Sequence, residues 1–187
     1  MFKSTINIFL LSFALFSFIA SAKSEQEVVD AFFKALTSSN FALASEQMDP
    51  TELEKFHGLF IEIAKSAEAK GKYSDFSVGP FVKYSSIKEF ESTQPVSFFT
   101  DFLVFTLSQN QQMIQLLNNA QYKFIGTVKE TEKTSFAVVK FAMHMAGETI
   151  EVTDVVPLIK NNGSYRLGLK ADMQIMAQAF KAQVAKI

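Results

Sequence analysis

The chain contains no cysteine and no tryptophan, and only seven glycines and four prolines in 187 residues. Without cysteine the protein can form neither a disulfide nor a thiolate metal site, so its core alone must hold the fold together. The few glycines form no GxGxxG or GxxxxGK loop, and no GxSxG elbow surrounds a serine. The two histidines, His57 and His144, lack the spacing of a zinc motif. We therefore expect neither a metal nor a cofactor.

An excess of charge of either sign is also missing. The chain has 18 Lys and Arg against 19 Asp and Glu, a formal net charge of -1, and no basic cluster. Proteins that bind nucleic acid or an anionic membrane surface usually carry a basic patch. We expect neither kind of partner.

The first 22 residues combine one lysine, an apolar run from 6 to 19 and the sequence ASA at 20 to 22. This pattern predicts a secretory signal peptide that is cleaved before Lys23. The alternative is a membrane anchor, but the apolar run is shorter than the ~20 residues that a spanning helix needs. No cysteine follows the run for lipid attachment. An exported chain without disulfides favours the bacterial periplasm over other secreted routes, and residues 23 to 187 have the length of a single domain.

Capping motifs and helical periodicity predict the N-terminal half. Residues 24 to 36 open with the capping box SEQE and continue with an apolar stripe, which predicts a helix. Asp-Pro at 49 and 50 predicts the start of a second helix that ends at Gly71. We interpret residues 71 to 84 as a loop. Another capping box at 86 to 89 precedes residues 95 to 107, where an almost unbroken apolar segment predicts a helix that is buried in the core or against a second subunit. QQMIQLL at 111 to 117 continues it for another turn or two.

From Gln121 the apolar period changes from 3.6 to 2, which predicts strands. Turn signals near 131, at 146 and 147, and at 162 and 163 divide this region into four strands of an antiparallel meander. Helical periodicity returns after Asp172. The predicted fold class is α+β, with N-terminal helices packed on a curved four-stranded antiparallel meander and a C-terminal helix.

The two later turns predict the same register for the third strand, with alternate residues from Ile150 to Leu158 on the inner face. Asp154 is then the one carboxylate in an otherwise apolar file, opposite Val139. The other pairs that these turns predict are Leu158 with Leu167, Val156 with Leu169, Met143 with Ile150, and Phe141 with Val152.

The opening EVVDAFFKALTSSNFALASEQM, the later LGL at 167 to 169 and the order of helices and strands resemble NTF2-like, or cystatin-like, α+β domains. The resemblance covers residues 24 to 170 and implies a curved sheet that wraps around the first helix to form a cone. In enzymes of this group, acids inside the cone transfer protons. Residues 71 to 120 and the segment after Asp172 go beyond this pattern, so we expect them to cover the mouth of a pocket.

Asp154 allows three interpretations, because an ionised carboxylate on an apolar face needs a partner. It can be structural and accept backbone amides at the start of the C-terminal helix, near Asp172. It can contact a ligand inside the cone. It can also face solvent through a bulge, or act as a general base with Tyr122 as the proton donor. The candidate residues of a ligand pocket are Asp154, Tyr122, Phe124 and Phe141.

The outer face of the predicted sheet mixes apolar residues with charged ones, and either the terminal helix or a second subunit would cover it. A homodimer is therefore one expected partner arrangement. The leading functional hypothesis is an exported, non-enzymatic domain that binds a small apolar ligand or a protein. The alternatives are a small NTF2-like enzyme acting on an apolar substrate, and an inhibitor or immunity-type protein that docks an exported enzyme.

Overall fold

The structure is a computed structural model, and it describes residues 22 to 73, 81 to 108, 111 to 145 and 147 to 173, together with 175, 177, 178 and 182. The predicted signal peptide, apart from Ala22, lies outside these residues. So do residues 74 to 80 of the predicted loop at 71 to 84 and the apolar residues Met176, Phe180 and Val184 of the predicted C-terminal helix.

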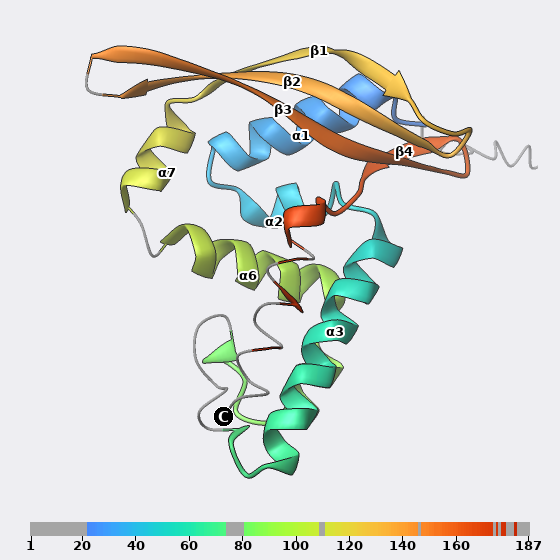
Figure 1. Ribbon diagram of the computed structural model, residues 1–187, viewed down its shortest axis with the longest axis vertical. Coiled ribbons are helices and arrows are strands. Elements are labelled where there is room, and N and C mark those ends of the chain that lie inside the picture. The colour runs from blue at the N-terminus through green and yellow to red at the C-terminus, as the bar shows by residue number, and fades with distance from the viewer. Residues whose placement is uncertain are drawn as a thin grey trace, which may run out of the picture.

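The fold is α+β, with helices followed by one antiparallel sheet and a helical C-terminal segment (Figure 1). The sheet order is β1-β2-β3-β4, which confirms the predicted meander. Helical residues begin again at Ala171. The elements are α1 (Glu25–Thr37), α2 (Phe41–Ser45), α3 (Pro50–Ala69), α5 (Ile87–Ser92), α6 (Pro95–Ser108), α7 (Gln111–Asn118), β1 (Gln121–Lys129), β2 (Thr134–Met145), β3 (Glu148–Asn161) and β4 (Ser164–Leu167).

The helix starts follow the predicted capping chemistry. The Ser24 side chain accepts the Glu27 amide and the Glu27 side chain accepts the Ser24 amide, which completes the capping box of α1. Asp49 caps α3, with proline at the first helical position. At α5 the Ser86 side chain accepts the amide of Glu89. The Glu89 side chain, however, accepts the amide of Ser85 at 2.9 Å, so the glutamate caps one residue earlier than predicted.

The register of the sheet agrees with the prediction at four of the five pairs. Val139 lies opposite Asp154, Phe141 opposite Val152 and Met143 opposite Ile150, and Leu158 pairs with Leu167. The predicted pair of Val156 with Leu169 is wrong, because β4 ends at Leu167. Residues 168 to 170 leave the ladder, and the Gly168 amide donates to the Pro157 carbonyl at 2.8 Å.

The sheet curves over α1, and the other described helices lie on the same side of it (Figure 1). Val28, Val29 and Phe33 of α1 are buried together with apolar side chains from the inner face of the sheet. The far edge of β4 is covered, since Leu167 donates its amide to Gln47 and accepts the amide of Asp49. The open outer edge that a meander would leave at β4 is therefore closed by the chain itself.

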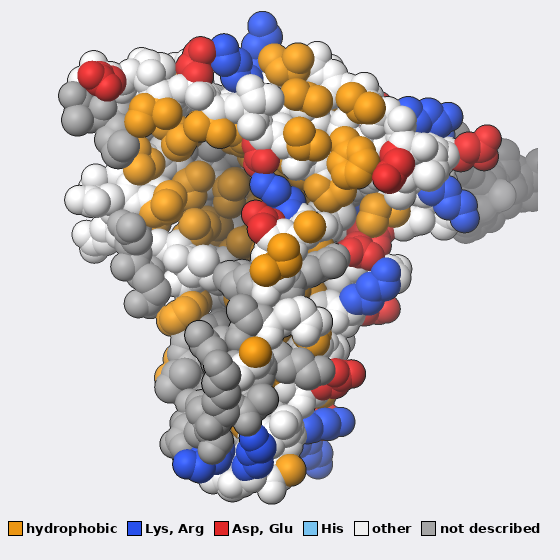
Figure 2. All heavy atoms as spheres, viewed as in Figure 1, with side chains coloured by type: hydrophobic (Ala, Val, Ile, Leu, Met, Phe, Trp, Pro, Cys, Tyr) orange, Lys and Arg blue, Asp and Glu red, His pale blue; other side chains and the backbone are white. Residues whose placement is uncertain are grey.

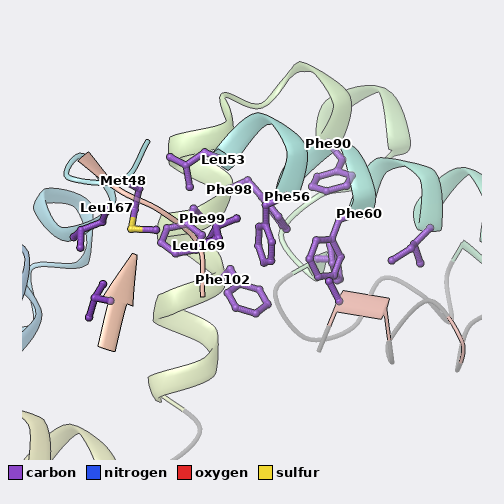
Figure 3. Packing of buried hydrophobic residues seen from close by; sticks show 14 of the residues in the cluster. Met48, Leu53, Phe56, Phe60, Phe90, Phe98, Phe99, Phe102, Leu167 and Leu169 are labelled. Atoms are coloured by element: carbon purple, nitrogen blue, oxygen red, sulfur yellow. The ribbon is translucent and has the colours of Figure 1, made fainter. Parts of the chain in front are cut away.

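A second part of the core joins α3, α5 and α6 and is mainly aromatic (Figure 3). The Phe56 ring makes edge-to-face contacts with Phe99 at 5.7 Å and Phe102 at 5.2 Å. Phe90 packs edge-on against Phe98 at 5.0 Å. Such ring pairs add to the stability that burial provides. This explains why the almost wholly apolar segment at 95 to 108 is held against α3.

Only part of the apolar surface of α6 is buried. Phe98, Phe99 and Phe102 are buried, whereas Val104 is 42% exposed and Leu103 is partly buried. The expectation of a helix that is buried all round therefore does not hold, because Ser97 in the first half and Val104 and Thr106 in the second half are exposed. The short helix α2, which the sequence pattern did not predict, fills the connection between α1 and α3.

At the start of the C-terminal segment, Ala171 and Asp172 border a cleft with Phe136, Val155 and Pro157 of the outer face of the sheet. Ala177 is fully buried, and Gln178 borders a small cleft with Phe56 and Leu59 of α3. The segment therefore starts beside the outer face, while Ala177 and Gln178 pack near α3 on the inner side of the sheet.

Candidate functional site

An apolar hollow lies between α1, α6 and the inner face of the sheet, and we call it the inner hollow. Its volume is 190 Å³. Figure 2 shows hydrophobic side chains gathered around a depression beneath the sheet, with a few charged side chains at its side. The residues that line it are Phe32, Phe33, Leu36, Met48, Phe99, Leu103, Asp154, Val156, Leu167, Gly168, Lys170 and Met173.

Local chemistry explains why these residues converge. Phe32, Phe33 and Leu36 lie on the face of α1 that meets the sheet, and Phe99 and Leu103 are four residues apart and so share one face of α6. Leu167 ends β4, after which the chain turns under the sheet at Gly168. A Cβ at Gly168 would lie 3.3 Å from Pro157 and Ile159, so the close approach of this turn to β3 favours glycine.

Asp154 and Lys170 are the charged pair of the inner hollow. The Lys170 ammonium lies 2.8 Å from Oδ1 and 2.9 Å from Oδ2 of Asp154. The Asp154 side chain is 34% exposed and that of Lys170 is 35% exposed, so the pair lies at the entrance of the hollow, in partial contact with water. Asp172 is a second, more distant carboxylate at 4.0 Å from the ammonium.

Asp154 also protects an open edge of the sheet. The Pro157 carbonyl accepts the amide of Gly168, so the odd-numbered residues of this part of β3 direct their backbone groups away from β2. β4 pairs with β3 only as far as Leu158, which leaves the Val155 amide without a strand partner. The Asp154 Oδ1 atom accepts that amide at 2.9 Å.

The structural interpretation of Asp154 therefore predicted the wrong hydrogen-bond partners. We expected amides near Asp172, but the carboxylate accepts the Lys170 ammonium and the amide of the next residue, Val155. Lys170 is the site residue that sequence reasoning missed. Its position two residues before Asp172 was the available signal, but the predicted register continued β4 through Leu169, so contact between Lys170 and Asp154 was not expected.

The other three pocket candidates lie deeper under the sheet and do not line the inner hollow. The Tyr122 hydroxyl donates to the backbone carbonyl of Asp30 at 3.2 Å, and burial, with a smaller effect of the Asp30 carboxylate, raises the pKa of Tyr122. Phe141 packs edge-on against Phe33 at 4.8 Å. Phe124 is partly buried against the same core. Tyr122 is therefore held by α1 and is not paired with Asp154.

A larger groove of 530 Å³ lies near the start of the described chain, and its side chains Lys23, Gln47 and Arg166 have partners within the chain. Lys23 Nζ donates to Gln47 Oε1 at 2.6 Å, and Arg166 donates to the Glu46 carbonyl. These contacts fasten residues 46 and 47 beside β4. We therefore take the inner hollow as the candidate site.

The described part of the chain holds no group of three or more His, Asp or Glu side chains arranged to bind a metal ion. None of its helices combines the length and apolar character needed to cross a membrane. Comparisons with protein-family models, with curated proteins and with solved structures give no match to this chain. The resemblance to NTF2-like domains thus stays a prediction from the sequence.

Proposed function

We propose that this protein is an exported, non-enzymatic binding domain that takes an apolar group into the inner hollow. The observation that carries the proposal is the hollow itself, a space of 190 Å³ whose lining is apolar except for one ion pair at the rim. Binding sites for small molecules are commonly concave and mostly apolar, with a few polar groups that orient the ligand.

The hydrogen bonds of Asp154 favour a role in binding over a role in catalysis. Both of its oxygens accept the Lys170 ammonium, and one of them also accepts the Val155 amide. The catalytic interpretation of Asp154 also required a proton donor within hydrogen-bond reach. Tyr122, the phenol considered as its partner, donates instead to the carbonyl of Asp30.

Binding can be tested with N-phenyl-1-naphthylamine, a neutral probe that fluoresces in apolar surroundings. We expect saturable binding to the mature protein and at least a tenfold loss of affinity in Leu103→Trp, because the indole would fill the hollow from α6. Val82→Trp is the matched control, since Val82 is 70% exposed and does not line the hollow. Equal affinities of Leu103→Trp and the parent, with both proteins folded by circular dichroism, would remove the proposal.

Export is proposed from the sequence of the first 22 residues, and the contacts of Lys23 agree with cleavage before it. The Lys23 amide nitrogen donates to Ser164 Oγ at 3.1 Å, and its carbonyl accepts the amide of Tyr165. A chain that begins at Lys23 keeps both contacts with β4. Expression of the full chain in a bacterium should yield a periplasmic protein whose N-terminal peptide begins at Lys23 by mass spectrometry, and an uncleaved cytoplasmic product would refute export.

A further inference from the structure

The polar groups at the rim of the inner hollow carry an inference about the ligand, one that rests on the proposed function. We propose that the ligand is a neutral amphiphile, an aliphatic group with an uncharged hydroxyl that binds between Asp154 and Lys170. Three observations support this chemistry: the spare hydrogen-bonding capacity of the pair, its charge balance, and the size of the space behind it.

The first observation concerns donors and acceptors. An ammonium has three N–H donors, and the contacts of Lys170 with the two oxygens of Asp154 use two of them. Asp154 Oδ1 accepts both Lys170 and the Val155 amide, whereas Oδ2 accepts Lys170 alone. One donor and one acceptor thus remain side by side. A hydroxyl can accept from the first and donate to the second without breaking the ion pair.

The second observation concerns charge. Asp154 and Lys170 neutralise each other at 2.8 Å, while Asp172, 4.0 Å from the ammonium, is 72% exposed, so water and salt screen its charge. A carboxylate on the ligand would have to compete with Asp154 for the ammonium and would lie beside a like charge. An amine would compete with Lys170 in the same way. Either charged group would also lose water at the entrance of an apolar space, which disfavours it relative to a neutral hydroxyl.

The third observation concerns size. A space of 190 Å³ equals the liquid volume of about six water molecules, and a methylene group is similar in size to water. The hollow therefore accommodates a chain of roughly six to eight carbons behind the hydroxyl. Beyond it, Val104 of α6 and Val152 of β3 are 42% and 44% exposed, so a longer chain would continue over apolar surface.

The test uses three probes with the same chain, 1-octanol, octanoate and octylamine, each displacing N-phenyl-1-naphthylamine from the mature protein at pH 7. We expect octanol to bind about two- to fivefold more tightly than either charged probe, the range expected for a half-exposed charge contact. Asp154→Asn should shift the preference toward octanoate, because Lys170 loses its carboxylate. Lys170→Met should shift it toward octylamine. Glu151→Gln is the matched control, since Glu151 pairs with Lys140 on the outer face of the sheet and does not line the hollow, and it should leave the ranking unchanged.

The two proposals fail in different ways. If none of the octyl compounds displaces the probe, or the probe itself does not bind, the proposed binding function is wrong. If all three bind with equal affinity, or if the two variants leave the ranking of the parent unchanged, the hollow binds apolar groups but Asp154 and Lys170 do not select the head group. A preference of the parent for octanoate or octylamine would equally overturn the inference.

Discussion

The carboxylate of Asp49 joins the start of α3 to the end of β3 through the side chain of Asn161. Asn161 Nδ2 donates to Asp49 Oδ2 at 2.5 Å, while Asp49 Oδ1 accepts the amides of Thr51 and Glu52 at 3.0 and 3.2 Å. Asp49 is only 1% exposed. One buried carboxylate therefore caps the longest described helix and fixes it to the sheet.

This relationship predicts a graded loss of stability. Asp49→Ala removes the cap and leaves the Asn161 amide unpaired, so we expect it to lower the free energy of unfolding by about 2 to 4 kcal/mol. Asp49→Ser keeps a capping oxygen but is too short to accept from Asn161, and it should cost about 1 kcal/mol. Asn161→Ala should cost a similar amount. Urea unfolding of the three variants measures these differences, and equal losses for Asp49→Ser and Asp49→Ala would contradict the capping role.

His57 predicts a pH dependence of stability. Its side chain is buried against Phe90 and Phe98, and its Nε2 atom lies 3.2 Å from the Phe90 carbonyl oxygen. Burial lowers the pKa of His57 below its ordinary value of 6.5, although the Phe90 carbonyl partly opposes this shift. Below pH 6.5 the unfolded chain takes up a proton at His57 that the folded protein resists, so stability should fall as the pH decreases and stay level above that value.

The measurement is the free energy of urea unfolding between pH 8 and pH 5 for the parent and two variants. His57→Gln removes the titrating group and should flatten the dependence between pH 6.5 and 5. The exposed His144 provides the control, because His144→Gln should keep the slope of the parent. If His57→Gln and the parent lose stability in parallel, His57 does not control this range of pH.

The outer face of the sheet predicts self-association. Val128 and Val155 are 60% and 48% exposed, and the strand registers place both on the face opposite to the helices, with Phe136 and Pro157 between them. All the described helices lie on the inner side (Figure 1). A partly apolar sheet face of this kind favours a second subunit.

We expect light scattering of the mature protein at micromolar concentration to give the mass of a homodimer. Val155→Lys would place a charge at the centre of that contact and should yield a monomer. Val82→Lys is the control, since Val82 is 70% exposed but lies outside the sheet, and it should leave the dimer intact. A parent protein that is monomeric at these concentrations excludes the contact.

The strand register could be predicted from the sequence because two short turns and one apolar file impose the same pairing on β3. Helix starts were predictable for a similar reason, since Ser24 and Asp49 supply local hydrogen bonds. The path after Leu167 was not predictable, because β4 ends there, and after the Gly168 amide, which donates to Pro157 in register, the chain no longer pairs with β3. That one departure moved Lys170 beneath the sheet and gave Asp154 its partner.

The candidate site, like the fold, could be predicted only where a local sequence pattern determines it. Asp154 was singled out because a charge on an apolar face is unusual, and the structure does place it at an apolar hollow. The opposite wall of the hollow comes from Phe99 and Leu103 of α6, and no local pattern relates α6 to β3. Contacts between elements more than 40 residues apart depend on packing, which periodicity within one element does not encode.

Asp154 itself gives the last prediction, which concerns stability without a ligand. Asp154→Ala removes the acceptor of the Val155 amide and the partner of Lys170, and it should cost about 1 kcal/mol, because both side chains are one-third exposed and water replaces part of each contact. Asp154→Asn keeps one acceptor oxygen for the amide and should cost about half as much. Lys170→Met combined with Asp154→Asn should lose less than the sum of the single variants, since the pair is already broken by either change. Thermal melts of the parent, the three single variants and the double variant test this order, and an Asp154→Ala protein that melts at or above the parent temperature would show that the carboxylate is kept for binding at the expense of stability.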